Sequence, residues 1–405
     1  MKRIVEKYLS LFTDENPLEI FSEDDLNFIY DCISLQEERR TNVRDQWGNW
    51  DFQYTEKNFS EPYCDLFVLE RLQQKGFRKK NIWPHGKPFA LCVTHDVDLF
   101  TDISPKSVIR HYMKKPAPGL RNKIEKPFVA SKNIALSCIR SLMSKRDILW
   151  NYEIWSDIES KYNFKSTFFA FVRPRDNKEI HEFDCLYRFS DPIVFRGKKS
   201  TVAGFFISIH NSGWEIGLHG SYLSYDSEKI LLKQKRSLQE VIQDDVISVR
   251  QHYLRYDISK TPLVHNSVGL KIDSTVGFNR NIGFRAGTCM PFFCEDNSGH
   301  ILDVLEFPQI IMDISLFSSS ALELDADKAI MRSIKLMDHV EKVGGCLIIN
   351  FHPNYLYEKK YMVVFETILQ EAKKRNAFNA TLKETKAVVE KTGYKVGSGK
   401  SNEVH

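Results

Sequence analysis

The stretch "THDVD", residues 94–98, places one imidazole and two carboxylates directly after the apolar segment "FALCV". Such a short, uniformly apolar run is typical of a buried strand. Asp96 and Asp98 are two positions apart, so on an extended backbone their side chains point the same way. One carboxylate can then hold a metal ion while the other stays free as a general base. For His95 we expect only a packing role beneath them.

Three further strand-like segments carry a histidine at or near their carboxyl ends. They are "EIGLHGS" with His219, "SVRQHYLRY" with His252 and "CLIINFHP" with His352. A single histidine is more often a hydrogen-bonded core or surface residue, but the repeated placement favours one shared site. Neutral imidazoles together with a carboxylate suit Zn²⁺ or another divalent transition metal. A metal with three protein ligands keeps a position open for water and lowers the pKa of that water.

The elements that must position these residues alternate along the chain. Apolar strand patterns at 89–96, 165–172, 215–221, 248–256 and 346–353 are separated by amphipathic helical patterns, among them 152–163, 227–242, 326–345 and 363–374. Repeated strand–helix units predict a parallel α/β sheet or barrel. The carboxyl ends of parallel strands meet at one rim, where enzymes of this architecture assemble their active sites.

Composition limits the remaining classes of protein. The chain has 405 residues, eight scattered cysteines without CxxC spacing, and a net charge of +4. Eleven Lys or Arg against one Glu between 104 and 146 give that segment a charge of +10, so the rest carries −6. This argues against nucleic-acid binding, because the basic residues are confined to one insertion and no recognition motif appears. We see no signal peptide and no transmembrane segment, and therefore expect a cytoplasmic protein with reduced thiols.

We expect three regions. Residues 1–82 form an N-terminal α+β addition, residues 83–390 form the barrel, and residues 391–405 form a disordered tail. The insertion 104–146 is long for a βα connection. Its charge favours peripheral contact with an anionic membrane or a lipid-linked substrate, and the alternative is a solvated surface loop.

The motifs "THDVD", "TFFAF", "EIGLHGS", "GFRAGT" and "NFHP", in this order and on these strands, resemble the polysaccharide deacetylases of carbohydrate esterase family 4 (NodB-like), in a divergent form. The resemblance covers about residues 83–382. It implies a distorted (β/α)₇ barrel and a metal-dependent removal of acetyl groups from sugars.

The resemblance also implies roles for individual residues. Asp96 matches the catalytic base and Asp98 the metal-binding acid, although Val97 separates a pair that the family keeps adjacent, so the two roles could be exchanged. His352 matches the general acid. Asp313 in "IMDISLF" matches the acid that pairs with that histidine.

Two family motifs are altered in this chain. His219 matches the first histidine of the family's metal-binding motif, but Leu223 stands where the second would be, and we expect His252 to supply the third ligand. The arginine that orients the catalytic aspartate is expected at Arg255, with Arg250 on the same segment and Arg285 in "GFRAGT" as the alternatives.

The predicted substrate contacts are Ser221, Tyr222 and Arg285. The predicted function is zinc-dependent hydrolytic deacetylation of an N-acetylated sugar, either a polysaccharide or a lipid- or nucleotide-linked precursor, in surface glycan synthesis. The missing motif histidine keeps open a non-catalytic carbohydrate-binding protein. A glycosidase is the other alternative, although Asp96 and Asp98 are closely set for its two flanking carboxylates.

Overall fold

A computed structural model of the chain describes residues 2–55, 57–100, 152–355 and 358–396. Its centre is a ten-stranded sheet with the strand order β10-β11-β1-β2-β5-β6-β7-β9-β8, and β12 pairs with β1. All neighbours are parallel except β8 and β9. The strands are β1 (Ala90–Val97), β2 (Thr167–Phe171), β5 (Glu215–Gly220), β6 (Ser248–Gln251), β7 (Ile272–Asp273), β8 (Phe292–Glu295), β9 (Ile301–Glu306), β10 (Gln309–Met312), β11 (Cys346–Asn350) and β12 (Phe378–Asn379).

The sheet is curled, and β10 at one end of the strand order is hydrogen-bonded to the loop that follows β7. Gln309, at the start of β10, donates its backbone N–H to the carbonyl of Val276 after β7, at 2.9 Å. The backbone N–H of Gly283 likewise donates to Ile310, at 2.9 Å. The expected fold class, a mixed α/β protein of the distorted (β/α)₇ barrel type, is confirmed.

Every residue of β1, β2, β5 and β11 is buried, which is why these strands read as apolar runs rather than alternating patterns. The register aligns their polar ends. Thr94 lies opposite Asn350, Phe171 opposite His219, and His219 opposite Arg250. The carboxyl ends of β1, β5, β6 and β11 therefore meet at one rim.

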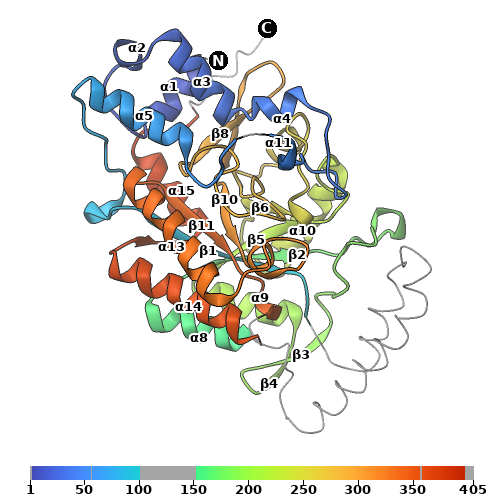
Figure 1. Cartoon of the computed structure of the whole chain (residues 1–405). Helices are drawn as coiled ribbons and strands as arrows, with labels where there is room; N and C mark the ends of the chain where they lie inside the picture. The colour runs from blue at the N-terminus through green and yellow to red at the C-terminus, as the bar shows by residue number, and fades with distance from the viewer. Residues whose placement is uncertain (1, 56, 101–151, 356–357, 397–405) are drawn as a thin grey trace.

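Helices cover the outside of the sheet, and in Figure 1 α8, α13 and α14 lie together beside β1 and β11. The 18-residue α13 begins at an Asp325 cap and ends at Gly344, whose φ of +79° suits only glycine well. The covering helices are α8 (Tyr152–Tyr162), α9 (Val202–Asn211), α10 (Glu228–Ile242), α11 (Thr261–Ser267), α12 (Asp313–Phe317), α13 (Ala326–Val343), α14 (Lys359–Lys374) and α15 (Leu382–Lys391). A hairpin of β3 (Pro192–Phe195) and β4 (Lys198–Thr201) stands apart.

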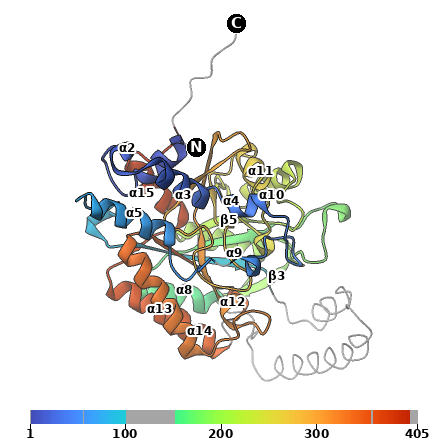
Figure 2. The same cartoon turned by 45° about the horizontal axis from the view of Figure 1, so that its top comes forward.

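The N-terminal region packs into the same core as the barrel. Its helices lie together at one end of the molecule in Figures 1 and 2. They are α1 (Lys2–Leu9), α2 (Pro17–Ile20), α3 (Glu23–Ile33), α4 (Gln36–Arg40) and α5 (Tyr63–Gln74). Tyr8 donates to both Asp65 and Thr288, which joins α1 and α5 to the barrel. Within its described residues this expected α+β addition is helical, apart from a bridge between Arg44 and Trp50.

Parts of three predictions fall on or beside segments that the structure does not describe. The basic insertion 104–146 lies outside the described residues, so its membrane contact stays a prediction. Of the expected disordered tail, residues 391–396 are described, and Tyr394 is buried with its hydroxyl 3.3 Å from the carbonyl of Pro291. Tyr394 thus packs against the barrel, and residues 397–405 lie outside the described residues. Within the described ranges no helix is both long and apolar enough to cross a membrane.

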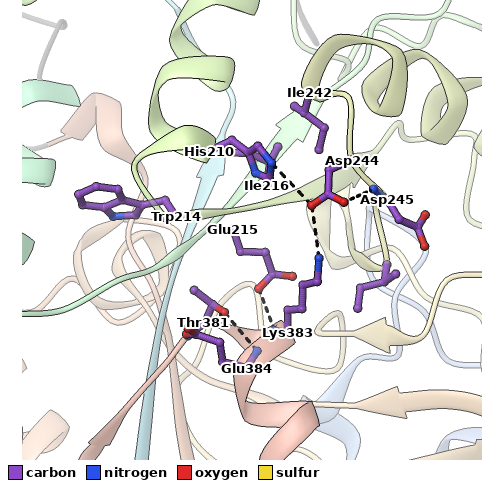
Figure 3. A pocket seen from close by; sticks show the side chains of 12 residues that line it. His210, Trp214, Glu215, Ile216, Ile242, Asp244, Asp245, Thr381, Lys383 and Glu384 are labelled. Atoms are coloured by element: carbon purple, nitrogen blue, oxygen red, sulfur yellow. Dashed lines mark hydrogen bonds and ion pairs between the residues drawn. The ribbon is translucent and has the colours of Figure 1, made fainter.

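A pocket of about 200 Å³ opens at the amino end of β5, away from the rim (Figure 3). The buried carboxylate of Glu215 accepts hydrogen bonds from Thr167 and Ser248, both at 2.7 Å, and from the backbone of Lys383 at 2.9 Å. Burial raises the pKa of Glu215. Because its oxygens are satisfied by protein groups, we interpret this residue as a brace between strands and α15.

Candidate metal and catalytic site

The carboxylate of Asp98 stands at the centre of a histidine cluster just beyond β1. Its Oδ1 atom lies 3.2 Å from Nε2 of His219 and 3.7 Å from Nε2 of His252. One ligand atom from each of these three residues lies within 4.8 Å of the others. The structure thus brings together all three residues predicted as metal ligands.

The donor set fits a divalent transition metal. Nδ1 of His219 donates to the carbonyl of Arg250 at 2.9 Å, which turns the other ring nitrogen toward Asp98. That nitrogen, Nε2, has no hydrogen-bond partner among the described residues, and neither has Nδ1 of His252. Burial lowers the pKa of His252 to about 4, so its imidazole is neutral at pH 7, as a ligand must be. A carboxylate and two imidazoles are a common ligand set for Zn²⁺.

Asp96 is held one step deeper, at the end of β1. Its Oδ1 accepts from Nη1 of Arg250 at 3.0 Å, and its Oδ2 accepts from Nδ2 of Asn350 at 2.8 Å. Burial raises the pKa of Asp96, but the positive charges of Arg250, His219 and His352 together outweigh burial, and the net shift is downward. The carboxylate is therefore ionised and fixed in orientation, as a general base requires.

Arg250, not Arg255, occupies the position expected of the orienting arginine. Its guanidinium is fully buried and also donates to Thr94 at 2.7 Å and to the carbonyl and hydroxyl of Ser274 at 2.7 and 2.8 Å. Arg255 instead donates to the carbonyl of Tyr222 and lies over its ring. The cause is local: β6 ends at Gln251, and the following turn redirects the chain before residue 255.

His352 follows β11 and faces both acids. Its Nε2 lies 3.5 Å from Oδ2 of Asp98 and 4.0 Å from Oδ2 of Asp96. Its Nδ1 donates to Oδ1 of Asp313 at 2.6 Å, and its backbone N–H donates to Oδ2 of the same acid at 2.7 Å. Burial lowers the pKa of His352, but the carboxylates of Asp313, Asp98 and Asp96 together outweigh burial and raise the pKa to about 9. A protonated imidazole is thus held beside the acids at neutral pH.

The predicted substrate contacts are placed differently. Arg285 is buried and makes a two-fold ion pair with Glu38 of α4, at 2.8 and 2.6 Å, so it has no surface for a substrate. Ser221 is also buried. Tyr222 is 6% exposed, and its hydroxyl donates to the carbonyl of Trp47 at 3.0 Å. Arg285 is committed to Glu38 and not to a substrate, whereas the predicted substrate contacts of Ser221 and Tyr222 stay predictions.

Two other observations concern residues whose role the sequence left open or missed. His95 is buried between Glu159 and the carbonyl of Phe351, both at 2.6 Å, so it packs beneath the site as expected. Asn350 was not predicted, although an amide inside the apolar run "CLIIN" is a usable signal for a buried polar contact.

No protein-family model and no curated protein matches the sequence. Solved structures are nevertheless similar. The allantoinase PuuE has a TM-score of 0.51 at 13% identity, over 78% of this chain and 95% of that one. A putative polysaccharide deacetylase from Mycobacterium smegmatis has 0.47 at 17%, over 77% and 93%. A probable polysaccharide deacetylase from Pseudomonas aeruginosa has 0.47 at 14%, over 79% and 96%. At these identities the similarity shows the fold.

Proposed function

We propose that this chain is a metal-dependent carbohydrate N-deacetylase of the polysaccharide deacetylase family. The observation that carries the proposal is the arrangement at the rim. Asp98, His219 and His252 gather their ligand atoms, while the Arg250-held Asp96 and the Asp313-held His352 face the same point. This set supplies a metal site, a base and an acid in one place, as hydrolysis of an amide requires.

In the proposed reaction Asp98, His219 and His252 would hold a divalent metal, most simply Zn²⁺, which when bound would supply Lewis-acid activation of the acetamide carbonyl and of the attacking water. Asp96 accepts a proton from that water as its oxygen bonds to the acetyl carbon. His352 then donates its proton to the sugar nitrogen as the carbon–nitrogen bond breaks. Acetate and a free amino sugar leave. Arg250 keeps Asp96 ionised until it accepts this proton, and Asp313 keeps the His352 ring oriented.

The substrate class extends this proposal. We propose an N-acetylated sugar in a polysaccharide or in a lipid- or nucleotide-linked precursor, used in surface glycan synthesis inside the cell. The +10 charge of residues 104–146 supports an anionic, diphosphate-linked substrate. The alternatives remain a non-catalytic carbohydrate-binding protein and a glycosidase. Because an allantoinase has the same fold, a cyclic amide is a further substrate to test.

The test combines metal analysis with product analysis. We expect purified protein to bind about one divalent metal per chain, and Asp98→Ala and His219→Ala to lose it. His300→Ala is the matched control, because His300 is an exposed histidine paired only with Asp296. A protein that binds no divalent metal would refute the proposal.

Products then separate the alternatives. The wild type is incubated with N-acetylated oligosaccharides, a nucleotide-linked N-acetyl sugar, a lipid-diphosphate-linked one and allantoin. Acetate release supports the proposal. Metal and sugar binding without acetate would indicate a binding protein, new reducing ends a glycosidase, and consumption of allantoin a cyclic amidohydrolase.

A further inference from the structure

A tight loop of the N-terminal region holds Trp47 in place without help from any ligand. The backbone N–H of Asp45 donates to the carbonyl of Asn49 at 2.7 Å. The Asp45 carboxylate accepts from the backbone N–H groups of Trp47 and Asn49, both at 2.9 Å. Gly48 closes the turn with φ +82°, a conformation that favours glycine. The indole at the loop tip is therefore preorganised.

This loop is fastened to the candidate site from two sides. The hydroxyl of Tyr222, which follows β5, donates to the carbonyl of Trp47 at 3.0 Å. Asn49 donates from Nδ2 to the carbonyl of Tyr253 at 2.9 Å and accepts at Oδ1 from the backbone of Tyr256 at 3.1 Å. The loop around Trp47 is thus hydrogen-bonded to segments about 200 positions later in the chain, the segments that follow β5 and β6 at the rim.

The ring of Tyr253 lies between the Trp47 indole and His252, one of the three proposed metal ligands. The ring centres of His219 and His252 are 4.9 Å apart, those of His252 and Tyr253 are 4.7 Å apart, and those of Tyr253 and Trp47 are 6.1 Å apart. Tyr253 and the next residue, Leu254, have φ of +60° and +51°. Non-glycine residues in this region cost about 1–3 kcal/mol each and concentrate at functional sites.

Trp47, Tyr253 and Phe183 are each half-buried, whereas Trp50, three residues along, is buried against Phe59. A rigid, partly exposed indole presents an apolar face at low entropic cost, which suits the C–H face of a pyranose ring. The Arg280 guanidinium, paired with Asp51, lies over the indole at 5.9 Å from the ring centre and places polar donors beside it. An aromatic surface with a few fixed polar groups is typical of a small-molecule site.

We propose that Trp47 stacks on a sugar ring adjacent to the residue that is deacetylated, so that the N-terminal loop 45–51 contributes a second sugar subsite. This inference rests on the proposed function and goes beyond it, because it identifies an oligomeric substrate. Trp47 is a specificity residue: it binds a neighbouring unit and takes no part in proton transfer.

The experiment compares Trp47→Ala and Trp47→Phe with the control Tyr54→Ala. Tyr54 is a strongly exposed aromatic (77%) of the same N-terminal region. The probes are tetra-N-acetylchitotetraose and N-acetylglucosamine. For each variant we measure kcat and KM for acetate release. Binding is measured by calorimetry on an Asp96→Asn background, which retains the three proposed metal ligands.

We expect Trp47→Ala to raise KM and Kd for the tetramer about tenfold with kcat unchanged. The monosaccharide, the metal affinity and the Tyr54→Ala variant should be unaffected. Trp47→Phe, which keeps a ring and the fold, should show a smaller loss. If both Trp47 variants match Tyr54→Ala, or if tetramer and monosaccharide weaken equally, the inference is wrong while the deacetylase proposal stands. If the wild type neither binds nor deacetylates the tetramer, the inference fails, and acetate release from the nucleotide- and lipid-linked sugars then decides the deacetylase proposal separately.

Discussion

The side chain of Asn49 hydrogen-bonds the carbonyl of Tyr253 at 2.9 Å, directly after the proposed ligand His252. Asn279 donates to the same carbonyl at 2.7 Å. These two amides hold a turn whose residues 253 and 254 both have positive φ. His252 therefore owes its position to an asparagine from the N-terminal region as well as to its own strand.

We expect Asn49→Ala to weaken zinc binding about 10- to 100-fold, as loss of a group that orients a ligand usually does. Loss of its two buried hydrogen bonds should also lower the free energy of unfolding by about 1–3 kcal/mol. Calorimetric zinc titration and urea unfolding measure both effects. Asn42→Ala, an exposed residue of the same region, is the control. Zinc affinity equal to that of the control would show that the turn holds without Asn49.

Arg250 and Arg255 can be separated by matched substitutions. Arg250→Met leaves the buried Asp96 carboxylate without its counter-charge, so we expect destabilisation of about 3–5 kcal/mol and a drop in kcat of at least 100-fold. Arg255→Met removes the contacts of a half-buried arginine with the carbonyl and ring of Tyr222. It should change kcat less than fivefold, because the contacts of Arg255 in the described structure go to Tyr222 and Tyr225 and not to either acid.

The measurements are urea unfolding and steady-state acetate release. Variants of Arg250 that fold too poorly to assay are replaced by Arg250→Lys, which keeps the charge. A larger kcat effect at Arg255 than at Arg250 would restore the assignment that the sequence favoured.

Asp313 is expected to act through His352. Asp313→Asn removes the carboxylate that fixes the ring, so we expect kcat to fall about 10- to 1000-fold while KM and zinc content stay near those of the wild type. Asp303→Asn is the control, because Asp303 is an exposed acid paired with Lys271. Loss of zinc from Asp313→Asn would instead show that this acid shapes the metal site.

From the buried carboxyl of Asp65 we expect the free energy of unfolding to depend on pH, independently of the candidate site. Burial raises the pKa of Asp65 to about 6, above the ordinary aspartate pKa of 3.8, even though Tyr8 and Cys289 donate hydrogen bonds to its carboxylate. The folded protein thus binds this proton more tightly than the unfolded chain. The resulting stabilisation is complete below pH 4 and is lost as pH rises through 6, a change of about 3 kcal/mol.

The test is urea unfolding of wild type and Asp65→Asn at pH 4 and pH 7. Other groups titrate equally in both proteins, so the difference between the two slopes isolates Asp65. We expect the variant to lose about 3 kcal/mol less than the wild type between these pH values. Parallel slopes would show that this carboxyl has an ordinary pKa in the folded state.

The strands, the order of the elements and most of the site could be predicted from the sequence. Buried parallel strands are apolar on both faces, so a charged residue at their ends is conspicuous. This signal identified five residues that the structure brings together at the rim: Asp96, Asp98, His219, His252 and His352. The family resemblance added Asp313. These residues come together because they follow parallel strands, whose carboxyl ends meet at one rim. The alternation of strands and helices in the sequence is enough to predict that arrangement.

The contacts of the arginines and of the N-terminal loop were decided only by the tertiary structure. Arg250 points inward because it lies within β6, whereas a left-handed turn redirects the chain before Arg255. Arg285 forms an ion pair with Glu38, which lies 247 residues away in the sequence. Trp47 and Asn49 reach the rim for the same reason: such contacts depend on how distant segments pack, and no local period or spacing encodes that.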